Sequence, residues 1–217
     1  MRYQTILFDL DGTLTESGPG IMNSAAYALR KFGIEVENVQ ELSKFVGPPL
    51  YASFMMFYGF SREKAEEAVS YFREYFKDKG IFENSPYPGI PELLRRLKAS
   101  GRRLIVATSK PEHFAIQIAD RFGFSEHLDL ICGSTMDSST IEKADIIRNV
   151  LKHLPGADKE HMLMVGDRLH DVAGAHACGL NCAGVLYGYG TREELAGHGA
   201  DFILESVREL EAFLLEE

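Results

Sequence analysis

A short apolar run that ends in two closely spaced acidic residues constrains this chain more than any other feature. Residues 6–8 have the length and residue types of a buried β-strand. Asp9 and Asp11 follow, and Gly12 then allows the backbone to turn sharply. A surface turn is one interpretation, because Asp and Gly are common in turns. The alternative is a binding site for a cation such as Mg²⁺, because two such close carboxylates repel each other unless they share a cation or a proton. Ligands of open α/β sheets also bind at the carboxyl ends of the strands, where this pair lies.

Composition and net charge narrow the class of protein. A chain of 217 residues can form one domain, or a domain with a smaller insertion, around a substantial core. Its net charge of −9 argues against broad nucleic-acid binding, but not against a phosphate substrate, because a bound metal can reverse the local charge. Three cysteines cannot form a complete disulfide framework. Without a signal-like start or an apolar stretch of about 20 residues, we expect a cytoplasmic protein with no membrane span.

Helical periodicity dominates residues 16–85, which we expect to form a separate helical cap domain. Helices are predicted from the spacing of apolar residues at 21–32, 39–45, 50–58 and 61–76. Between the second and third of these helices, Gly47, Pro48 and Pro49 interrupt the pattern. This turn is either an ordinary connection between helices or a rigid loop directed at a substrate.

From residue 86 onward, helical and strand patterns alternate. Helices are expected at 92–100, 111–122, 142–153 and 172–178, with a last helix near the carboxyl end, and strands at 103–107, 128–132, 161–165, 181–186 and 201–204. Such alternation predicts an α/β fold with a Rossmann-like, doubly wound parallel sheet. The first strand belongs to the same sheet, so residues 1–15 and 86–217 are expected to form one core domain.

Polar residues follow several of the expected strands and should meet at one edge of the sheet. Thr108 and Ser109 follow one strand, Asp167 and Asp171 follow another, and Lys143 begins a helix after a loop rich in Ser and Thr. The four carboxylates of this edge would face a single lysine, so we infer that a divalent cation is obligatory for function. Lys110 and Arg168 lie beside these motifs and either contact the substrate or carry solvated charges.

Together these motifs resemble those of the haloacid dehalogenase (HAD) superfamily of phosphohydrolases, in the family's order, over essentially the whole chain. The matching residues are Asp-x-Asp-Gly-Thr at 9–13, Thr108 after an apolar strand, Lys143, and Gly-Asp-x-x-x-Asp at 166–171. Residues 47–50 and 184–195 resemble the phosphoglycolate phosphatase-like branch of the family. The chain departs from many relatives at Ala144, where they have proline after the motif lysine.

The resemblance implies a Mg²⁺-dependent phosphatase that works through an aspartyl phosphate. Asp9 would be the nucleophile, and Asp11 would protonate the leaving oxygen and then activate water. The backbone N–H groups of Leu10 and Ser109, with the side chains of Thr108 and Lys143, would hold the phosphoryl group. The metal ligands would be Asp9, the carbonyl of Asp11, Asp167, and Asp171 through water.

Other functions on related scaffolds remain open at this point. A dehalogenase would not need Asp11 or Asp167, whereas a phosphosugar mutase would keep both residues. Receiver-type phospho-acceptor modules share an acidic pocket with a lysine but are shorter and lack a helical cap, and an inactive HAD-like binding partner is conceivable. For a phosphatase, a small phosphorylated metabolite such as phosphoglycolate is expected, with nucleoside monophosphates, pyrophosphate and sugar phosphates as alternatives. The oligomeric state is not predicted.

Overall fold

The chain divides into two compact units in the computed structural model, which describes residues 2–135 and 142–215. The core unit comprises Met1–Thr15 and Pro86–Glu217, and the helical unit comprises Glu16–Ser85. Where the chain passes from one unit to the other, strands β2 (Thr15–Glu16) and β3 (Ser85–Pro86) pair in a two-stranded sheet. The helical unit is therefore an insertion between two strands of the core unit. Its role as a cap is a prediction.

The core unit is built on a six-stranded sheet with the order β5-β4-β1-β6-β7-β8. Every pair of neighbouring strands is parallel. The strands are β1 (Thr5–Phe8), β4 (Arg103–Pro111), β5 (Leu130–Ser134), β6 (Met162–Gly166), β7 (Asn181–Val185) and β8 (Phe202–Leu204). This arrangement confirms the α/β, doubly wound parallel sheet that the sequence predicted.

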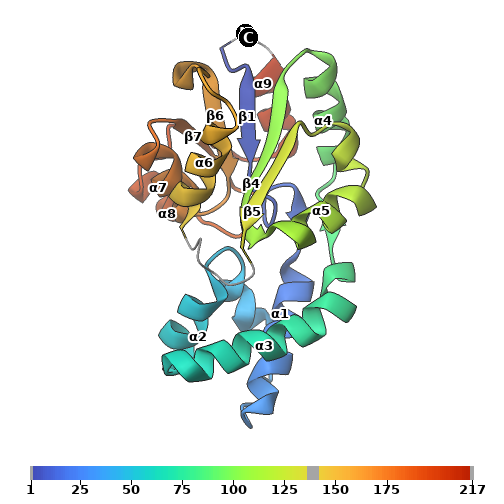
Figure 1. Cartoon of the computed structure of the whole chain (residues 1–217), viewed down its shortest axis with the longest axis vertical. Helices are drawn as coiled ribbons and strands as arrows, with labels where there is room; N and C mark the ends of the chain where they lie inside the picture. The colour runs from blue at the N-terminus through green and yellow to red at the C-terminus, as the bar shows by residue number, and fades with distance from the viewer. Residues whose placement is uncertain (1, 136–141, 216–217) are drawn as a thin grey trace. The chain divides into compact units, whose positions relative to one another are not determined.

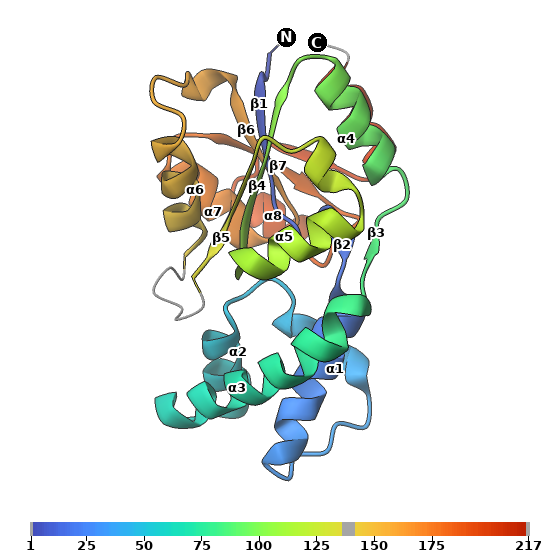
Figure 2. The ribbon, with the colours of Figure 1, turned by 45° about the vertical axis from the view of Figure 1, so that its right-hand side comes forward.

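Helices cover both faces of the sheet (Figures 1 and 2). From β1 the chain moves to β4 and β5 on one side, then returns to β6, β7 and β8 on the other side. Because such crossovers are right-handed, the two directions place their helices on opposite faces. One face carries α4 (Ile90–Ala99), α5 (Glu112–Arg121) and α9 (Val207–Leu215), and the other carries α6 (Lys143–Lys152), α7 (Leu169–Ala177) and α8 (Arg192–Gly197). The order reverses at β1, where such sheets bind ligands.

The central strand β1 is buried on both faces of the sheet, as expected for a parallel strand between two helical layers. Beneath α6 and α7, Leu7 packs in one apolar cluster with residues of the neighbouring strands, including Ile105 and Met164. Ile147 and Val172 bring the two helices onto this cluster. The core therefore fixes the ends of β1, β4 and β6 next to one another.

The helical unit is formed by α1 (Gly18–Lys31), α2 (Leu50–Tyr58) and α3 (Arg62–Asp78), with short 3₁₀ helices at Val39–Phe45 and Gly80–Phe82. Its interior is aromatic: the rings of Phe45 and Phe54 meet edge to face, with centroids 5.0 Å apart. The expected loop lies between Val39–Phe45 and α2. Gly47 has a positive φ of 99°, and Pro49 precedes the first turn of α2.

Several element boundaries differ from those expected. Residues 39–45 form a 3₁₀ rather than an α-helix, and β4 extends four residues beyond Ala107 because its pairing with β5 continues past an irregularity in register. Helix α7 begins at Leu169 rather than Val172, because the side chain of Asp171 accepts the backbone N–H of Arg168 and closes the first turn. The loop expected before Lys143 lies mostly outside the described residues.

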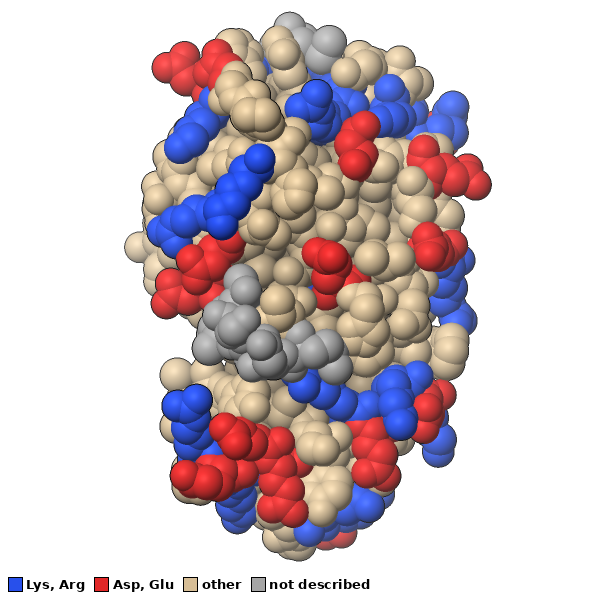
Figure 3. Space-filling model, viewed as in Figure 1, with Lys and Arg blue, Asp and Glu red and all other residues tan. Residues whose placement is uncertain are grey.

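Two further observations concern the distribution of charged side chains on the surface and the apolar character of the helices. On the face shown in Figure 3, Lys and Arg side chains are interspersed with Asp and Glu. Among the described residues, no helix combines the length and apolar character needed to cross a bilayer.

Candidate active site

The end of β1 places Asp9 between the ends of two neighbouring strands. Phe8 pairs with Val106 of β4 on one side and with Val165 of β6 on the other. The backbone N–H of Asp9 continues this ladder by donating to the carbonyl of Val165 at 2.9 Å. The position of the Asp9 carboxylate is therefore set by the sheet itself.

The chain turns tightly after Asp9 and wraps around one carbonyl. The backbone N–H groups of Leu14 and Thr15 both donate to the carbonyl oxygen of Leu10 at 2.9 Å. Gly12 has a positive φ of 85°, and a Cβ atom at this position would collide with the carboxylate of Asp167. Glycine is therefore required here for its backbone conformation and for the space that it leaves to Asp167.

Three buried carboxylates converge at this edge of the sheet. Asp9, Asp167 and Asp171 each offer an oxygen, and these oxygens all lie within 4.8 Å of one another. Each residue exposes 4% of its surface or less. The carboxylate of Asp11 is not part of this group of three, which we call the acidic cluster. Instead it forms an ion pair with Lys110, whose Nζ lies 2.8 Å from Asp11 Oδ2.

Lys143 supplies the positive charge at the centre of the acidic cluster. Its Nζ lies 2.8 Å from Asp9 Oδ1 and 2.8 Å from Asp171 Oδ1, and it donates to the carbonyl of Ala107 at 3.1 Å. The side chain is almost fully buried. Gly174 of α7 makes this position possible, because a Cβ there would come within 2.8 Å of Lys143 Cβ. Ala144, the departure from the motif, is buried in the first turn of α6.

Burial of like charges shifts the acid–base behaviour of the cluster. Burial raises the pKa of Asp9 to about 6, with Asp171 adding to the shift and Lys143 opposing it. The pKa of Asp167 is also well above its ordinary range, because of burial and then the charges of Asp171 and Asp9. Burial disfavours the charged form of Lys143, but Asp171 and Asp9 outweigh this effect and raise its pKa. Lys143 therefore stays protonated, but it does not supply enough positive charge to keep all three acids in their carboxylate form at ordinary pKa values.

The acidic cluster fits a hard divalent cation. All of its ligand atoms are carboxylate oxygens, which Mg²⁺ prefers, and they are close enough to approach one ion. The pKa values of Asp9 and Asp167 are raised by burial and by the neighbouring carboxylates, and a bound cation would lower them again by favouring the charged forms. Asp171 already contacts Lys143 and the N–H of Arg168, consistent with a ligand that acts through water.

A glycine-rich loop after β7 holds Asp167 in place. The backbone N–H of Tyr189 donates to Asp167 Oδ2 at 2.8 Å, and Thr13 Oγ1 donates to Asp167 Oδ1 at 3.3 Å. A Cβ on Gly188 would collide with Asp167 Cβ and with the carbonyl of Gly12, and one on Gly190 would collide with the carbonyl of Asp167. The sequence showed this loop only as a family resemblance, since its packing depends on strands far apart in the chain.

The remaining predicted residues occupy different places. Thr108 is buried, and its hydroxyl accepts the backbone N–H of Lys110 at 3.2 Å; Ser109 is half-buried. Residues 47–49 belong to the other unit, and their contact with a substrate remains a prediction. The side chain of Arg168 pairs with Glu194 at 2.9 Å.

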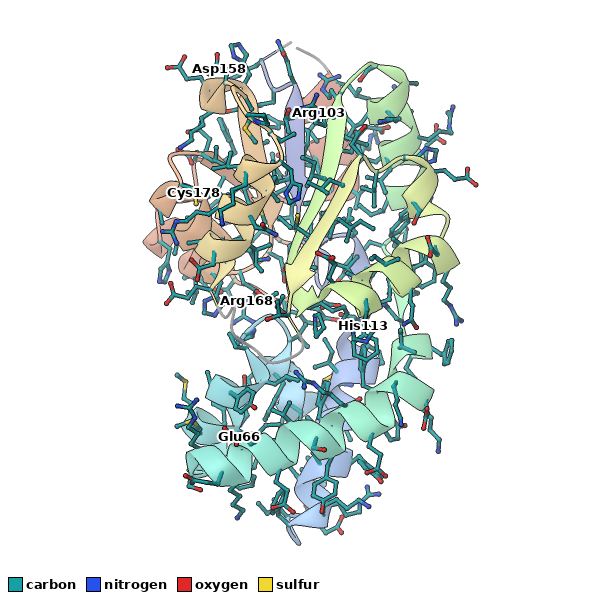
Figure 4. All side chains as sticks on the ribbon, viewed as in Figure 1. Glu66, Arg103, His113, Asp158, Arg168 and Cys178 are labelled. Atoms are coloured by element: carbon teal, nitrogen blue, oxygen red, sulfur yellow. The ribbon has the colours of Figure 1, made fainter. Side chains whose placement is uncertain are left out.

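The residues labelled in Figure 4 mark the two ends of the core unit. Figure 4 shows Arg168 and His113 at the end of the core unit where the strands finish, whereas Arg103 and Asp158 lie at the opposite end. Lys110 is a buried partner of Asp11 and not the solvated charge that was one interpretation of the sequence, whereas a contact with substrate remains a prediction. No local pattern signals this contact, because the two residues are distant in the chain.

Replacing Gly188 by alanine should weaken metal binding, because the added methyl group displaces Asp167. We expect the Mg²⁺ Kd to rise by about 10- to 100-fold, the usual cost of disturbing a residue that supports a metal ligand. Isothermal titration calorimetry of the folded variant measures this change. Gly197→Ala is the matched control, because nothing lies within 4 Å of a Cβ at Gly197. An unchanged Kd in Gly188→Ala would contradict this account of the loop.

Stabilisation by Mg²⁺ should increase with pH. The raised pKa of Asp9 means that its contribution to stability is present below its unfolded pKa near 3.8 and is lost as pH rises through about 6. A bound cation offsets this loss, and at 100 times its Kd it adds about 2.7 kcal/mol to the free energy of unfolding. Thermal unfolding with and without Mg²⁺ should therefore show a larger shift in Tm at about pH 7.5 than at about pH 5, where protons compete with the ion. Equal shifts at both pH values would count against this site.

Comparisons with known proteins agree with this geometry. The family model described as "Haloacid dehalogenase-like hydrolase" matches residues 6–185. A protein from Pseudomonas aeruginosa named 5'-nucleotidase is 46% identical over 198 residues, covering 91% of this chain and 89% of that protein. The tyrosine-protein kinase PtkA of Mycobacterium tuberculosis is 40% identical over 86% of this chain, but the match spans only 63% of PtkA. Less similar relatives include proteins named phosphoglycolate phosphatase and pyrophosphatase PpaX.

Solved structures show the same fold. The crystal structure of a predicted phosphatase from Clostridium acetobutylicum is 47% identical and superposes with a TM-score of 0.96, covering all of both chains. The matched family region includes all three residues of the acidic cluster, which follow β1 and β6. The family resemblance of the sequence motifs is thereby confirmed, and the chain belongs to the haloacid dehalogenase-like hydrolases.

Proposed function

We propose that this hydrolase is a Mg²⁺-dependent phosphatase that cleaves a small phosphate monoester through an aspartyl phosphate on Asp9. The observation that carries the proposal is the acidic cluster, in which three buried carboxylates lie close together and only Asp9 and Asp171 contact Lys143. Such a site suits an anionic substrate only with additional positive charge. The family match and the names of the relatives agree with action on phosphate esters.

In the first half of the reaction, a carboxylate oxygen of Asp9 attacks phosphorus. The bond between phosphorus and the ester oxygen breaks, and Asp11 gives a proton to the departing oxygen. Lys143 contacts Asp9 at 2.8 Å and orients its carboxylate. Burial of the cluster limits access of bulk water, so the carboxylate of Asp9 and not water attacks phosphorus in this step.

In the second half, water hydrolyses the aspartyl phosphate. Asp11, now a carboxylate, takes the proton of the attacking water, and Asp9 is regenerated as inorganic phosphate leaves. The hydroxyl of Thr108 and the N–H groups of Leu10 and Ser109 donate to phosphoryl oxygens. These fixed donors stabilise charge that develops in both transition states.

Asp9, Asp167, Asp171 and the carbonyl of Asp11 are the groups that would hold Mg²⁺. When bound, the ion neutralises carboxylate and phosphoryl charge, which positions the two anions for reaction. Mg²⁺ usually binds through one or two carboxylates and keeps several water molecules, so Asp171 can act through water.

The relatives narrow the substrate to a class of small phosphorylated metabolites. The relative named 5'-nucleotidase is 46% identical, whereas one relative named phosphoglycolate phosphatase is 32% identical and one named pyrophosphatase PpaX is 28% identical. Nucleoside monophosphates are therefore the first esters to test. Phosphoglycolate, pyrophosphate and sugar phosphates are the alternatives.

Asp9→Asn should abolish turnover, because an amide is a poor nucleophile and a poor ligand for Mg²⁺. We expect a fall in kcat of at least about 10³-fold, measured as phosphate release from a panel of monoesters with Mg²⁺ and with EDTA. Asp120→Asn is the control, because this acid lies at an exposed position of α5. Substantial phosphate release by Asp9→Asn would remove Asp9 from the assigned role. Wild-type activity that persists in EDTA would show that the reaction does not require a metal ion.

The loop at residues 47–49 is proposed to contact the part of the substrate that is not phosphate. Pro48→Ala should alter the ratio of kcat/KM between two natural monoesters by several-fold, while the turnover of p-nitrophenyl phosphate changes little, because Pro48 belongs to the helical unit and not to the catalytic groups. Steady-state kinetics on the same panel provides the measurement. Equal effects on every ester would indicate an ordinary connection between helices.

A further inference from the structure

A buried ion pair joins the proposed acid–base residue to a lysine outside the acidic cluster. Lys110 Nζ lies 2.8 Å from Asp11 Oδ2, and the two side chains are only 5% and 10% exposed. Lysine and aspartate are rarely buried to this degree unless they are paired. The contact is therefore a built feature of the site, separate from the one between Lys143 and Asp9.

The backbone around Lys110 is fixed from two directions. Its N–H donates to Thr108 Oγ1 at 3.2 Å, within the stretch where β4 shifts its register against β5. On the neighbouring strand, a Cβ at Gly133 would lie 2.6 Å from the carbonyl of Lys110, so glycine lets β5 approach closely there. Irregularities of this kind redirect side chains at strand ends.

The ion pair distinguishes the two oxygens of Asp11. Oδ2 is held by Lys110, whereas Oδ1 is buried and has no hydrogen-bond partner among the described residues. The terminal torsion of an aspartate is broad, so rotamer preference alone does not orient its carboxylate. The contact at 2.8 Å supplies that orientation and leaves Oδ1 as the oxygen available to a reacting group.

We propose that Lys110 is a positioning residue that fixes Asp11 Oδ2, so that Oδ1 exchanges the proton with the leaving oxygen and later with water. This inference rests on the proposed phosphatase function and assigns a role to a residue that the mechanism above does not use. Lys110 acts on the proton-transfer group, whereas Lys143 acts on the nucleophile.

The dependence of rate on the leaving group tests this role. An alkoxide must receive a proton as it departs, whereas p-nitrophenolate leaves as an anion. Lys110→Met should therefore lower kcat/KM for adenosine 5'-monophosphate by about 100-fold, the lower bound of a general-acid contribution, and for p-nitrophenyl phosphate by less than about 10-fold. The ratio kcat/KM is suitable because it reports only the steps up to departure of the leaving group. A lysine that merely bound phosphate or supported the fold would lower both values equally, and that result would overturn the proposal.

Two further variants keep the test decisive if Lys110→Met folds poorly. Lys110→Arg retains a charged donor and should restore much of the selective loss, and Lys110→Gln should fall between the two. If neither variant differs from wild type in the ratio of the two esters, the proposal fails. In an Asp11→Asn background, Lys110→Met should cause no further selective loss, because the group that it positions is absent. An additional loss there would also contradict the proposal.

A matched control and the wild type separate this inference from the proposed function. Lys98→Met removes a lysine that also pairs with an aspartate, Asp129, at 2.6 Å, but in the part of the core where β4 begins. It should leave both values of kcat/KM unchanged, whereas a selective loss there would show that the readout is not specific to the Lys110 contact. Absence of Mg²⁺-dependent phosphate release from every ester in the wild type would overturn the proposed function itself. An active enzyme with an unaltered ratio in the Lys110 variants would overturn only the positioning role.

Discussion

The concentration of negative charge at the end of β1 is the constraint on which the rest of this structure depends. Three carboxylates whose oxygens lie within 4.8 Å of one another are buried beside one ammonium group. Removing charges from water costs several kcal/mol per ion, and one lysine cannot offset that cost for three acids. The pKa values of Asp9 and Asp167 are raised because the charged forms of these buried acids are not fully stabilised by nearby positive charge. A fold that maintains such a cluster sacrifices stability locally, as sites built for chemistry do.

The parallel sheet brings these carboxylates to one edge, and glycine residues allow the segments that carry them to approach closely. The register of β1 with β4 and β6 fixes the backbone that carries Asp9, so the proposed nucleophile follows directly from a paired strand. Around Asp167, Gly12, Gly188 and Gly190 each stand where a Cβ would collide with that residue or its neighbours. Most of these glycines are needed for close approach rather than for turning the chain. The site therefore depends on the absence of side chains as much as on the acids that are present.

The sequence predicted the fold well because alternating apolar patterns are local, and a parallel sheet buried on both faces leaves continuous apolar strands. It also predicted that Asp9, Asp167, Asp171 and Lys143 lie close together, since strand ends of one parallel sheet share an edge. It did not predict the pairing of Lys110 with Asp11, which depends on a register shift in β4 and on close approach at Gly133. Nor did it show how residues 187–190 support Asp167. Contacts of this kind join segments far apart in the chain and leave no periodic signal.

The Lys110 contact changes the charge balance of the site. Counting all four carboxylates against Lys143 and one divalent cation leaves a net negative charge, which would oppose an arriving phosphate. When Asp11 is ionised, its charge is offset separately by Lys110, whose Nζ lies 2.8 Å from Asp11 Oδ2. Lys143 and the proposed divalent cation would then have only Asp9, Asp167 and Asp171 to balance, and three positive charges would match three negative ones. In the proposed first step Asp11 carries the proton for the leaving oxygen, so the charge of Lys110 is not offset when the substrate arrives. A phosphate dianion would then approach a site with net positive charge and fixed donors, which favours electrostatic stabilisation of the transferring phosphoryl group.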